Sequence, residues 1–460
     1  MRNEYLSAQL KDFVDEKYKK ARFMNSEKII KEAKLRNSKK QNAFLFLYRI
    51  RAMSLSIAFV LAIYIVISYL SSSNGLMGAC MHTACLSDSG NYSSGWNNCI
   101  DISDRKSTQN NPKINTNQQF DFEVITAGEW NDNLNWSFFQ QLISEQPSFK
   151  QYLLGWGLTP TSRIAVTVTC DGKPVEAAKI RLIDSKNNTI WTSVTNNNGI
   201  AYLFYNLYDN SQNPPFKLQV ISGIATKTLR LSYGQDEVSV EVSKAIRLPK
   251  SLDLMFAIDT TSSMYDELSY IKSQIEDVVS RISEQNIDLR LSYIFYRDEG
   301  DEYVVRSYPF VNGKEQINAA NAFLKLQQAA GGGNEYPDAV DKALEEAVYN
   351  LNWSDTSTAK LLFLIHDSPA YNNEATKQKL HKLIQDISAK GIRIIPVSTN
   401  GISLDTEFLM RSLAITSGGT YVFFTDSSEN IPSKLKPTIG EFEAEQLNDL
   451  MVRIINTYLK

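Results

Sequence analysis

Asp259, Thr261 and Ser263 carry oxygen atoms at alternating positions, directly after an apolar run that begins at Leu252. If that run is a strand that ends in a tight turn, the three side chains can converge on one point. A carboxylate with two hydroxyls is a hard-oxygen donor set, which suits Mg²⁺, Mn²⁺ or Ca²⁺ rather than zinc. The three residues are therefore candidate ligands of a divalent cation, and Mg²⁺ is the favoured ion.

A helix pattern follows the turn at once. Apolar residues recur there at helical spacing, namely Met264, Leu268, Ile271, Ile275, Val279 and Ile282. A buried strand that leads through a turn into a helix is the opening unit of a parallel α/β sheet, in which ligands bind beyond the carboxyl ends of the strands. The sequence thus predicts that the candidate ligands lie at that edge of a sheet.

A second apolar strand pattern, residues 361–365, also ends in a carboxylate. It is followed by His366 and Asp367. A carboxylate at the end of a central strand completes an oxygen-rich constellation with Asp259, so Asp367 is a further candidate ligand. We expect His366 to be a neutral, hydrogen-bonded neighbour, because a lone histidine beside a buried strand is seldom a ligand of a hard cation.

The spacing Asp259-x-Thr261-x-Ser263 resembles the Asp-x-Ser/Thr-x-Ser motif of the von Willebrand factor A domain, a family that binds a divalent cation at a metal-ion-dependent adhesion site. The resemblance covers residues 252–460. It implies an α/β fold with a doubly wound, mostly parallel six-stranded sheet. His366 stands where the family usually has threonine. Asp298 and Asp301 belong to a similar Tyr-Arg-Asp-x-Gly-Asp segment, which we interpret as an acidic turn without ligands.

The family places a second metal loop where this chain has the glycines 331–333. The loop should contribute a threonine or aspartate, and this chain departs from that pattern. Counting back from Pro337 matches the position to Glu335, whereas counting from the glycines favours Asn334, so both stay candidates. Asp338, just before the next helix pattern, is interpreted as a helix cap.

Two segments precede the metal-site domain of residues 251–460. Residues 161–250 alternate in the manner of short strands separated by Asp-Gly and Asn-Gly turns, which predicts a small β-sandwich spacer. The run that begins at Asp171-Gly172 is similar to transthyretin-like or collagen-adhesin B-type repeats. Residues 119–160 are rich in aromatic side chains and are expected to form a helical adaptor that is largely buried.

The N-terminal third carries signs of a membrane anchor. Residues 1–51 hold 14 Lys and Arg against 6 Asp and Glu, a basic tail. Residues 52–72 contain an uncharged apolar stretch of nineteen residues, which at ~1.5 Å each spans about 28 Å of bilayer as a helix. No Lys or Arg occurs in 71–104, so the positive-inside rule places the N-terminus in the cytoplasm. The chain is expected to be a single-pass membrane protein with its bulk at the cell surface.

Residues 73–118 form a stalk rich in Ser, Asn and Cys. Cys80 follows a segment that resembles a bacterial lipoprotein cleavage box, but a polar run separates it from the apolar stretch, which leaves lipid anchoring as the weaker alternative. The chain has four cysteines, and their pairing stays open among three connectivities. They are Cys80, Cys85, Cys99 and Cys170.

The net charge and the absence of catalytic sequence motifs exclude several classes of function. The chain carries −3 overall and −11 after the basic tail, which argues against nucleic acid as the main partner. A haloacid-dehalogenase-like phosphatase needs an acidic residue where Thr261 stands, and no nucleotide loop or serine nucleophile elbow is present. We expect no enzyme and no small-molecule substrate, but a module that engages a partner's Asp or Glu through the cation. A structural spacer with a non-functional site and, more weakly, a Mg-dependent hydrolase are the alternatives.

Overall fold

The computed structural model describes the chain from residue 125 to residue 460, with gaps at 209–211, 247, 333–336, 400–401 and 426–436. Within the described part, no helix is both long enough and apolar enough to cross a membrane. Several expected features lie outside the described residues: the basic tail, the membrane span at 52–72, the stalk with Cys80, Cys85 and Cys99, and the loop residues Asn334 and Glu335.

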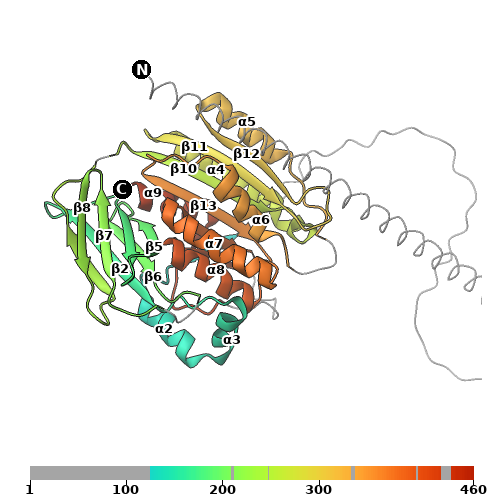
Figure 1. Ribbon diagram of the computed structural model, residues 1–460. Helices are drawn as coiled ribbons and strands as arrows, with labels where there is room; N and C mark the ends of the chain where they lie inside the picture. The colour runs from blue at the N-terminus through green and yellow to red at the C-terminus, as the bar shows by residue number, and fades with distance from the viewer. Residues whose placement is uncertain (1–124, 209–211, 247, 333–336, 400–401, 426–436) are drawn as a thin grey trace, which may run out of the picture. The chain divides into compact units, whose positions relative to one another are not determined.

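Residues 251–460, together with β1 from the N-terminal part of the described chain, form an α/β unit with a mixed sheet of eight strands. Figure 1 shows its central strands between helices. The strands lie in the order β12-β11-β10-β13-β14-β15-β1-β16. The five central strands from β11 to β15 in this order pair in parallel, whereas β12 runs antiparallel to β11, and β1 runs antiparallel to both β15 and β16. In chain order they are β1 (Thr126–Trp130), β10 (Ser251–Asp259), β11 (Asp288–Tyr296), β12 (Val305–Asn312), β13 (Ala359–His366), β14 (Arg393–Ser398), β15 (Tyr421–Thr425) and β16 (Ala444–Gln446).

The six strands expected from the sequence are all present, but the count of six was wrong. The two additional strands are β1, from the segment expected to be helical, and β16, just before the last helix. β1 is five residues long with Gly128 at its centre, and β16 is three residues long. Such short segments carry no readable alternation of apolar and polar residues, so only their pairing with β15 and with each other makes them strands.

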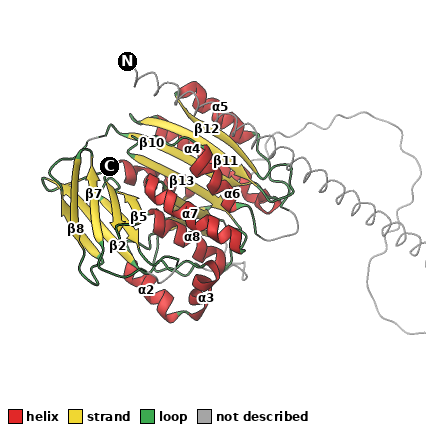
Figure 2. Cartoon of the chain, viewed as in Figure 1, coloured by secondary structure: helices red, strands yellow, loops and turns green. Residues whose placement is uncertain are grey.

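Helices cover both faces of the sheet, as the colouring in Figure 2 makes plain. Alternate residues of β10 contribute to different hydrophobic clusters, Leu254 and Phe256 to one and Met255 and Ala257 to the other. α4 (Tyr265–Ser283), α5 (Lys314–Lys325) and α9 (Leu447–Leu459) belong to the first cluster. The second cluster includes α6 (Val340–Glu345), α7 (Glu374–Lys390) and α8 (Leu404–Ser417). α6 continues directly into the π-helical turn η2 (Glu346–Asn350), which belongs to the same cluster.

Residues 163–241, the β-rich region, form two four-stranded sheets whose buried side chains share one apolar cluster. The first sheet contains β2 (Arg163–Cys170), β3 (Lys173–Pro174), β6 (Ile200–Phe204) and β9 (Glu237–Glu241). The second contains β4 (Lys179–Ile183), β5 (Thr189–Val194), β7 (Lys217–Ser222) and β8 (Ala225–Arg230). The expected likeness of this region to transthyretin-like or B-type repeats stays a prediction.

The second of these sheets packs directly against the α/β unit. Trp191 of β5 donates through Nε1 to the Ser388 hydroxyl of α7 at 3.0 Å. The Tyr208 ring stacks on the His381 ring with 4.2 Å between centroids, and its hydroxyl donates to the His381 carbonyl at 2.7 Å. These contacts fix α7, and through it the neighbouring strands, against the β-rich region.

The aromatic-rich segment is built into the α/β unit through a buried ion pair. Its helices α2 (Trp136–Glu145) and α3 (Pro147–Trp156) follow β1, and α3 contacts α8. Arg411 of α8 is fully buried and donates from Nε and Nη2 to both carboxylate oxygens of Asp132, at 2.9 and 2.6 Å. Glu407, one turn earlier, also accepts from Arg411. The segment is therefore locked onto α8 by charge as well as by apolar packing.

Candidate metal site

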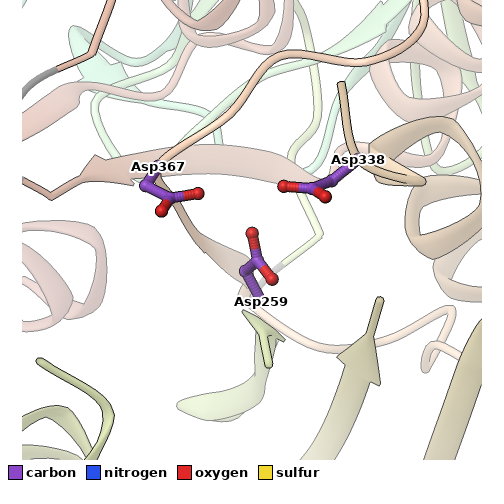
Figure 3. A group of neighbouring side chains, drawn as sticks. All are labelled: Asp259, Asp338 and Asp367. Atoms are coloured by element: carbon purple, nitrogen blue, oxygen red, sulfur yellow. The ribbon is translucent and has the colours of Figure 1, made fainter. Parts of the chain in front are cut away.

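Three carboxylates from distant parts of the chain meet at the carboxyl edge of the sheet (Figure 3). Asp259 is the last residue of β10 and Asp367 follows the last residue of the adjacent β13. Asp338 precedes α6, where its backbone N–H donates to the Pro369 carbonyl at 3.0 Å. One oxygen from each carboxylate lies within 4.8 Å of the other two, so the three can share one cation.

The position of the cluster follows from the order of the strands. The chain leaves β10 through α4 to β11 on one side, and returns through α6 to β13 on the other side. The connections diverge to opposite faces of the sheet at this point, with α4 on one face and α6 on the other. Ligands of open α/β sheets bind at such a switch point.

The turn after β10 fixes the orientation of Asp259. Its Oδ1 accepts two hydrogen bonds from Thr261, from the backbone N–H and from the hydroxyl, both at 2.8 Å. The Thr261 hydroxyl also lies 2.9 Å from the Ser263 hydroxyl. Asp259 Oδ1 is thus engaged with the turn, while its Oδ2 faces the other carboxylates without a hydrogen-bond partner in the described structure.

A glycine turn packs against this arrangement. The Ser262 hydroxyl donates to the Gly331 carbonyl at 2.6 Å, and the Gly332 N–H donates to the Asp301 carboxylate at 2.7 Å. Both glycines have positive φ, and a Cβ on Gly332 would lie 2.9 Å from the Cβ of Thr261. The close approach therefore requires glycine, because a side chain at either position is strained and at Gly332 also crowds the Asp259 turn.

The electrostatics of the cluster favour a bound cation. Burial, with the charges of Asp338 and Asp367, raises the pKa of Asp259 well above its usual range. Burial and the charges of Asp367 and Asp298 raise the pKa of Asp338 to about 7. Asp259 Oδ2 and Asp367 Oδ1 are buried and have no hydrogen-bond partner among the residues that the structure describes. Buried like charges with orphaned oxygens fit a hard divalent cation, which supplies the missing positive charge.

The structure brings Asp259, Thr261, Ser263 and Asp367 into one place, as expected from the sequence. The interpretation of Asp338 as a helix cap was wrong. The residue that caps α6 is Ala339, without a side-chain cap hydrogen bond, and the Asp338 carboxylate points into the cluster. Asn334 and Glu335 lie outside the described residues, so the contribution of their loop stays a prediction.

His366 is a neutral neighbour in the structure. It is fully buried, and its Nε2 lies 2.9 Å from the Ser398 hydroxyl. Burial lowers the pKa of His366 to about 3, so the ring carries no charge near neutral pH. The acidic turn is tied to the surroundings of the site rather than to the cluster itself: Asp298 accepts from the Tyr371 hydroxyl and Asp301 holds Gly332.

Arg297 is a positioning residue that sequence reasoning did not single out. Its guanidinium is largely buried and donates to the Thr260 carbonyl at 3.1 Å and to the Gln328 carbonyl at 2.8 Å. It thereby ties the Asp259 turn to the chain that leads into the glycine turn. The sequence feature that could have identified Arg297 is its position directly after β11, because the ends of β10 and β13 lie at the same edge of the sheet.

The comparisons with known proteins agree with this description. Residues 253–436 match the model of the von Willebrand factor type A domain, and a domain of this type is supported for that part of the chain. The α-protein kinase vwkA of Dictyostelium discoideum is 24% identical over 216 residues, 46% of this chain and 33% of that protein. The chain thus spans about a third of the length of this curated relative.

Many solved structures resemble part of the chain, and they include the following two. A von Willebrand factor type A protein from Catenulispora acidiphila is 13% identical, with 46% of this chain and 42% of that chain covered and a TM-score of 0.31. Proximal thread matrix protein 1 from the mussel byssus, described with a zinc-occupied MIDAS motif, is 16% identical, with 36% and 40% covered and a TM-score of 0.28.

Asp338→Asn tests the membership of this residue in the site. Removing one of three carboxylates should weaken Mg²⁺ or Mn²⁺ binding by about tenfold or more, because affinity follows the number of ligand charges. The same change should stabilise the cation-free protein at neutral pH, since it relieves buried like-charge repulsion. Calorimetric titration and thermal melts measure both effects. Asp288→Asn, an exposed carboxylate at the opposite sheet edge, is the control and should change neither.

Added cation should offset a loss of stability that the protein shows at higher pH. Burial and neighbouring charges raise the pKa of Asp338 to about 7 and raise the pKa of Asp259 well above its usual range. The stability that protonation of these two residues contributes is therefore fully present below the unfolded pKa of about 3.9 and is lost as pH rises through the folded-state pKa values. Thermal melts in cation-free buffer should therefore show this loss between about pH 5 and about pH 8. Saturating Mg²⁺ should raise the melting temperature more at the higher pH. A gain that is equal at both values would contradict protonation of the cluster.

Proposed function

With a von Willebrand factor type A domain supported over residues 253–436, we propose that this protein is a cation-dependent binding module, which engages an acidic side chain of a protein partner through a divalent cation held by Asp259, Asp338 and Asp367. Thr261 and Ser263 are proposed to complete the ligand set. Mg²⁺ is the proposed ion, and Mn²⁺ and Ca²⁺ share the same preference for oxygen.

The observation that carries the proposal is the pair of orphaned buried oxygens, Asp259 Oδ2 and Asp367 Oδ1, between three converging carboxylates. Buried acceptors without partners are rare, and each calls for a donor or an ion. Among the described residues, the donors that contact Asp259, the backbone N–H and the hydroxyl of Thr261, both bond to its Oδ1. The unpaired oxygens thus face the position that a cation would take.

Within the described residues, the chain orients the proposed ligand oxygens, and the surface beside them is formed by the turn that follows Asp259. Asp259 is held by Thr261, and Asp338 by the backbone after β13. Ser262 and Ser263 are exposed, and the ring of Tyr265, on the following turn, is 75% exposed. A divalent cation bound here would keep coordination positions that a partner's carboxylate can fill in place of water. Tyr265 offers an apolar surface beside it.

We propose a binding role and no catalytic one. The kinase activity that names the Dictyostelium relative belongs to a protein of which this chain spans about a third, so we do not extend it to this chain. Within the described part of the site, hard-oxygen ligands surround a shared centre, and the neighbouring histidine is buried and neutral. This chemistry suits capture of an acidic group rather than turnover of a substrate.

Selection of peptides against the full-length protein in mild detergent tests the proposal. A random peptide display panned in Mg²⁺ and eluted with chelator should enrich sequences with Asp or Glu. Replacing that acid by its amide in the peptide, or making Asp259→Ala in the protein, should abolish binding by calorimetry. Lys186→Met, an exposed substitution in the β-rich region, is the control and should bind normally. Enriched peptides that ignore both chelator and amide replacement would refute carboxylate capture.

We further propose that the apolar stretch at residues 52–72 anchors the module in a membrane, with the basic tail in the cytoplasm and the binding domain outside. The absence of Lys and Arg between 71 and 104, next to fourteen in the first 51 residues, supports this orientation. Alkaline extraction of cell membranes should leave the protein in the pellet, and protease added to intact cells should remove the C-terminal domain. Release into the alkaline supernatant would contradict the anchor.

A further inference from the structure

A cavity lies at the edge of the sheet opposite the candidate metal site. It has a volume of about 340 Å³ and opens between the β-rich region and the α/β unit. Its walls come from the starts of β4, β13 and β14, the end of α7 and the loop between η2 and β13. Cavities of this size fall at the lower end of the range for small-molecule sites.

Positive charge converges on this cavity although the region after the basic tail is acidic overall. Four cationic side chains line it against a single carboxylate, Asp355. The cations come from separate elements: Lys179 from β4, Lys360 from β13, Lys390 from the end of α7 and Arg393 from β14.

Lys360 is partly buried between Lys179 and Lys390, which are exposed, so one of the three lysine charges is poorly solvated. Burial lowers the pKa of Lys360, and the charges of Lys390 and Lys179 act in the same direction, opposed by Asp253 and Asp355. Asp253 is itself engaged, since it pairs with Arg290 at 2.8 Å and accepts from the Ser357 hydroxyl at 2.6 Å. An anion in the cavity would relieve this excess of positive charge.

The ammonium groups have donors to spare. The Lys360 amine donates to the Lys390 carbonyl at the end of α7, and the Lys390 amine donates to the Val348 carbonyl of η2. In these contacts, the two lysines supply hydrogen bonds to backbone carbonyl groups at the ends of helices, which is their structural role. Each ammonium nevertheless carries three N–H donors, so most of them stay available to a ligand. A doubly charged oxyanion with several acceptor oxygens matches this arrangement.

We propose that this cavity is a binding site for a phosphate group, free or carried on a small molecule, held by Lys179, Lys360 and Lys390. Tyr349 and Trp353 on the rim would face whatever the phosphate carries. The site does not depend on the proposed cation. Lys360 and Asp367 are seven residues apart along β13 and its end, a separation of roughly 23 Å at about 3.3 Å per residue.

Calorimetric titration of the full-length protein with two probes, inorganic phosphate and glucose 6-phosphate, tests the proposal. Divalent ions are removed from all buffers beforehand, because phosphate would otherwise bind to a cation at the carboxylates. Saturable binding of at least one probe is expected, with equal affinity in wild type and in Asp259→Ala. Tighter binding of glucose 6-phosphate would assign the site to a phosphorylated small molecule. Equal or tighter binding of inorganic phosphate would assign it to the free anion.

Lysine substitutions locate the site. Lys360→Met keeps the aliphatic stem and should weaken probe binding by about tenfold or more, the effect of losing a charge-assisted hydrogen bond. Lys179→Met, at an exposed position that tolerates change, should weaken it as well and covers the case in which Lys360→Met fails to fold. Lys186→Met makes the same charge change outside the cavity and should bind as wild type does.

Two results would overturn the proposal. One is the absence of saturable binding of either probe at millimolar concentration. The other is binding that Lys179→Met and Lys360→Met leave unchanged, including binding that is lost only in Asp259→Ala. Because the titrations contain no divalent ion, failure here leaves the proposed cation-dependent binding untouched, and failure of the peptide selection leaves this site untouched.

Discussion

Mutual repulsion among three closely placed carboxylates, two of them buried, is the constraint on which the arrangement of this domain depends. Asp259, Asp338 and Asp367 would not approach one another in a free chain, because like charges in a poorly solvated place disfavour ionisation. The pairing of β10 with β13 holds two of them together, over a register from Leu252↔Ala359 to Ile258↔Ile365. The sheet thus opposes the repulsion, and a cation would remove it. The proposed cation binding would for this reason be coupled to stability.

Rigidity around the cluster comes from short polar contacts rather than from apolar packing. Thr261 orients one carboxylate, and Arg297 ties the same turn to the chain before the glycine turn. Gly331 and Gly332 let the backbone approach where any side chain would be strained. The ligand oxygens are therefore placed before a cation arrives, which reduces the ordering cost of binding.

The two edges of the sheet have opposite chemistry. The carboxyl ends of β10 and β13 gather acids, whereas the amino ends of β13 and β14, with the end of α7, gather lysines and Arg393. The β-rich region helps to form the basic cavity at the amino ends of the strands. It packs against α7 through Trp191, which closes the cavity and brings Lys179 to it. That region therefore does more than extend the chain away from its N-terminal part.

The sequence by itself determined six of the eight strands and the main helices of the α/β unit, and it marked Asp259, Thr261, Ser263 and Asp367 as candidate ligands, because long apolar runs and local spacing encode these features. It did not reveal β1 and β16, which are too short to show a pattern and exist through pairing alone. It also misassigned Asp338, since a residue before a helix resembles a cap until the fold shows where its carboxylate points. Only the tertiary structure brings together residues as distant as Asp259 and Asp367, or Lys179 and Lys360, because strand order is decided by packing across the whole domain.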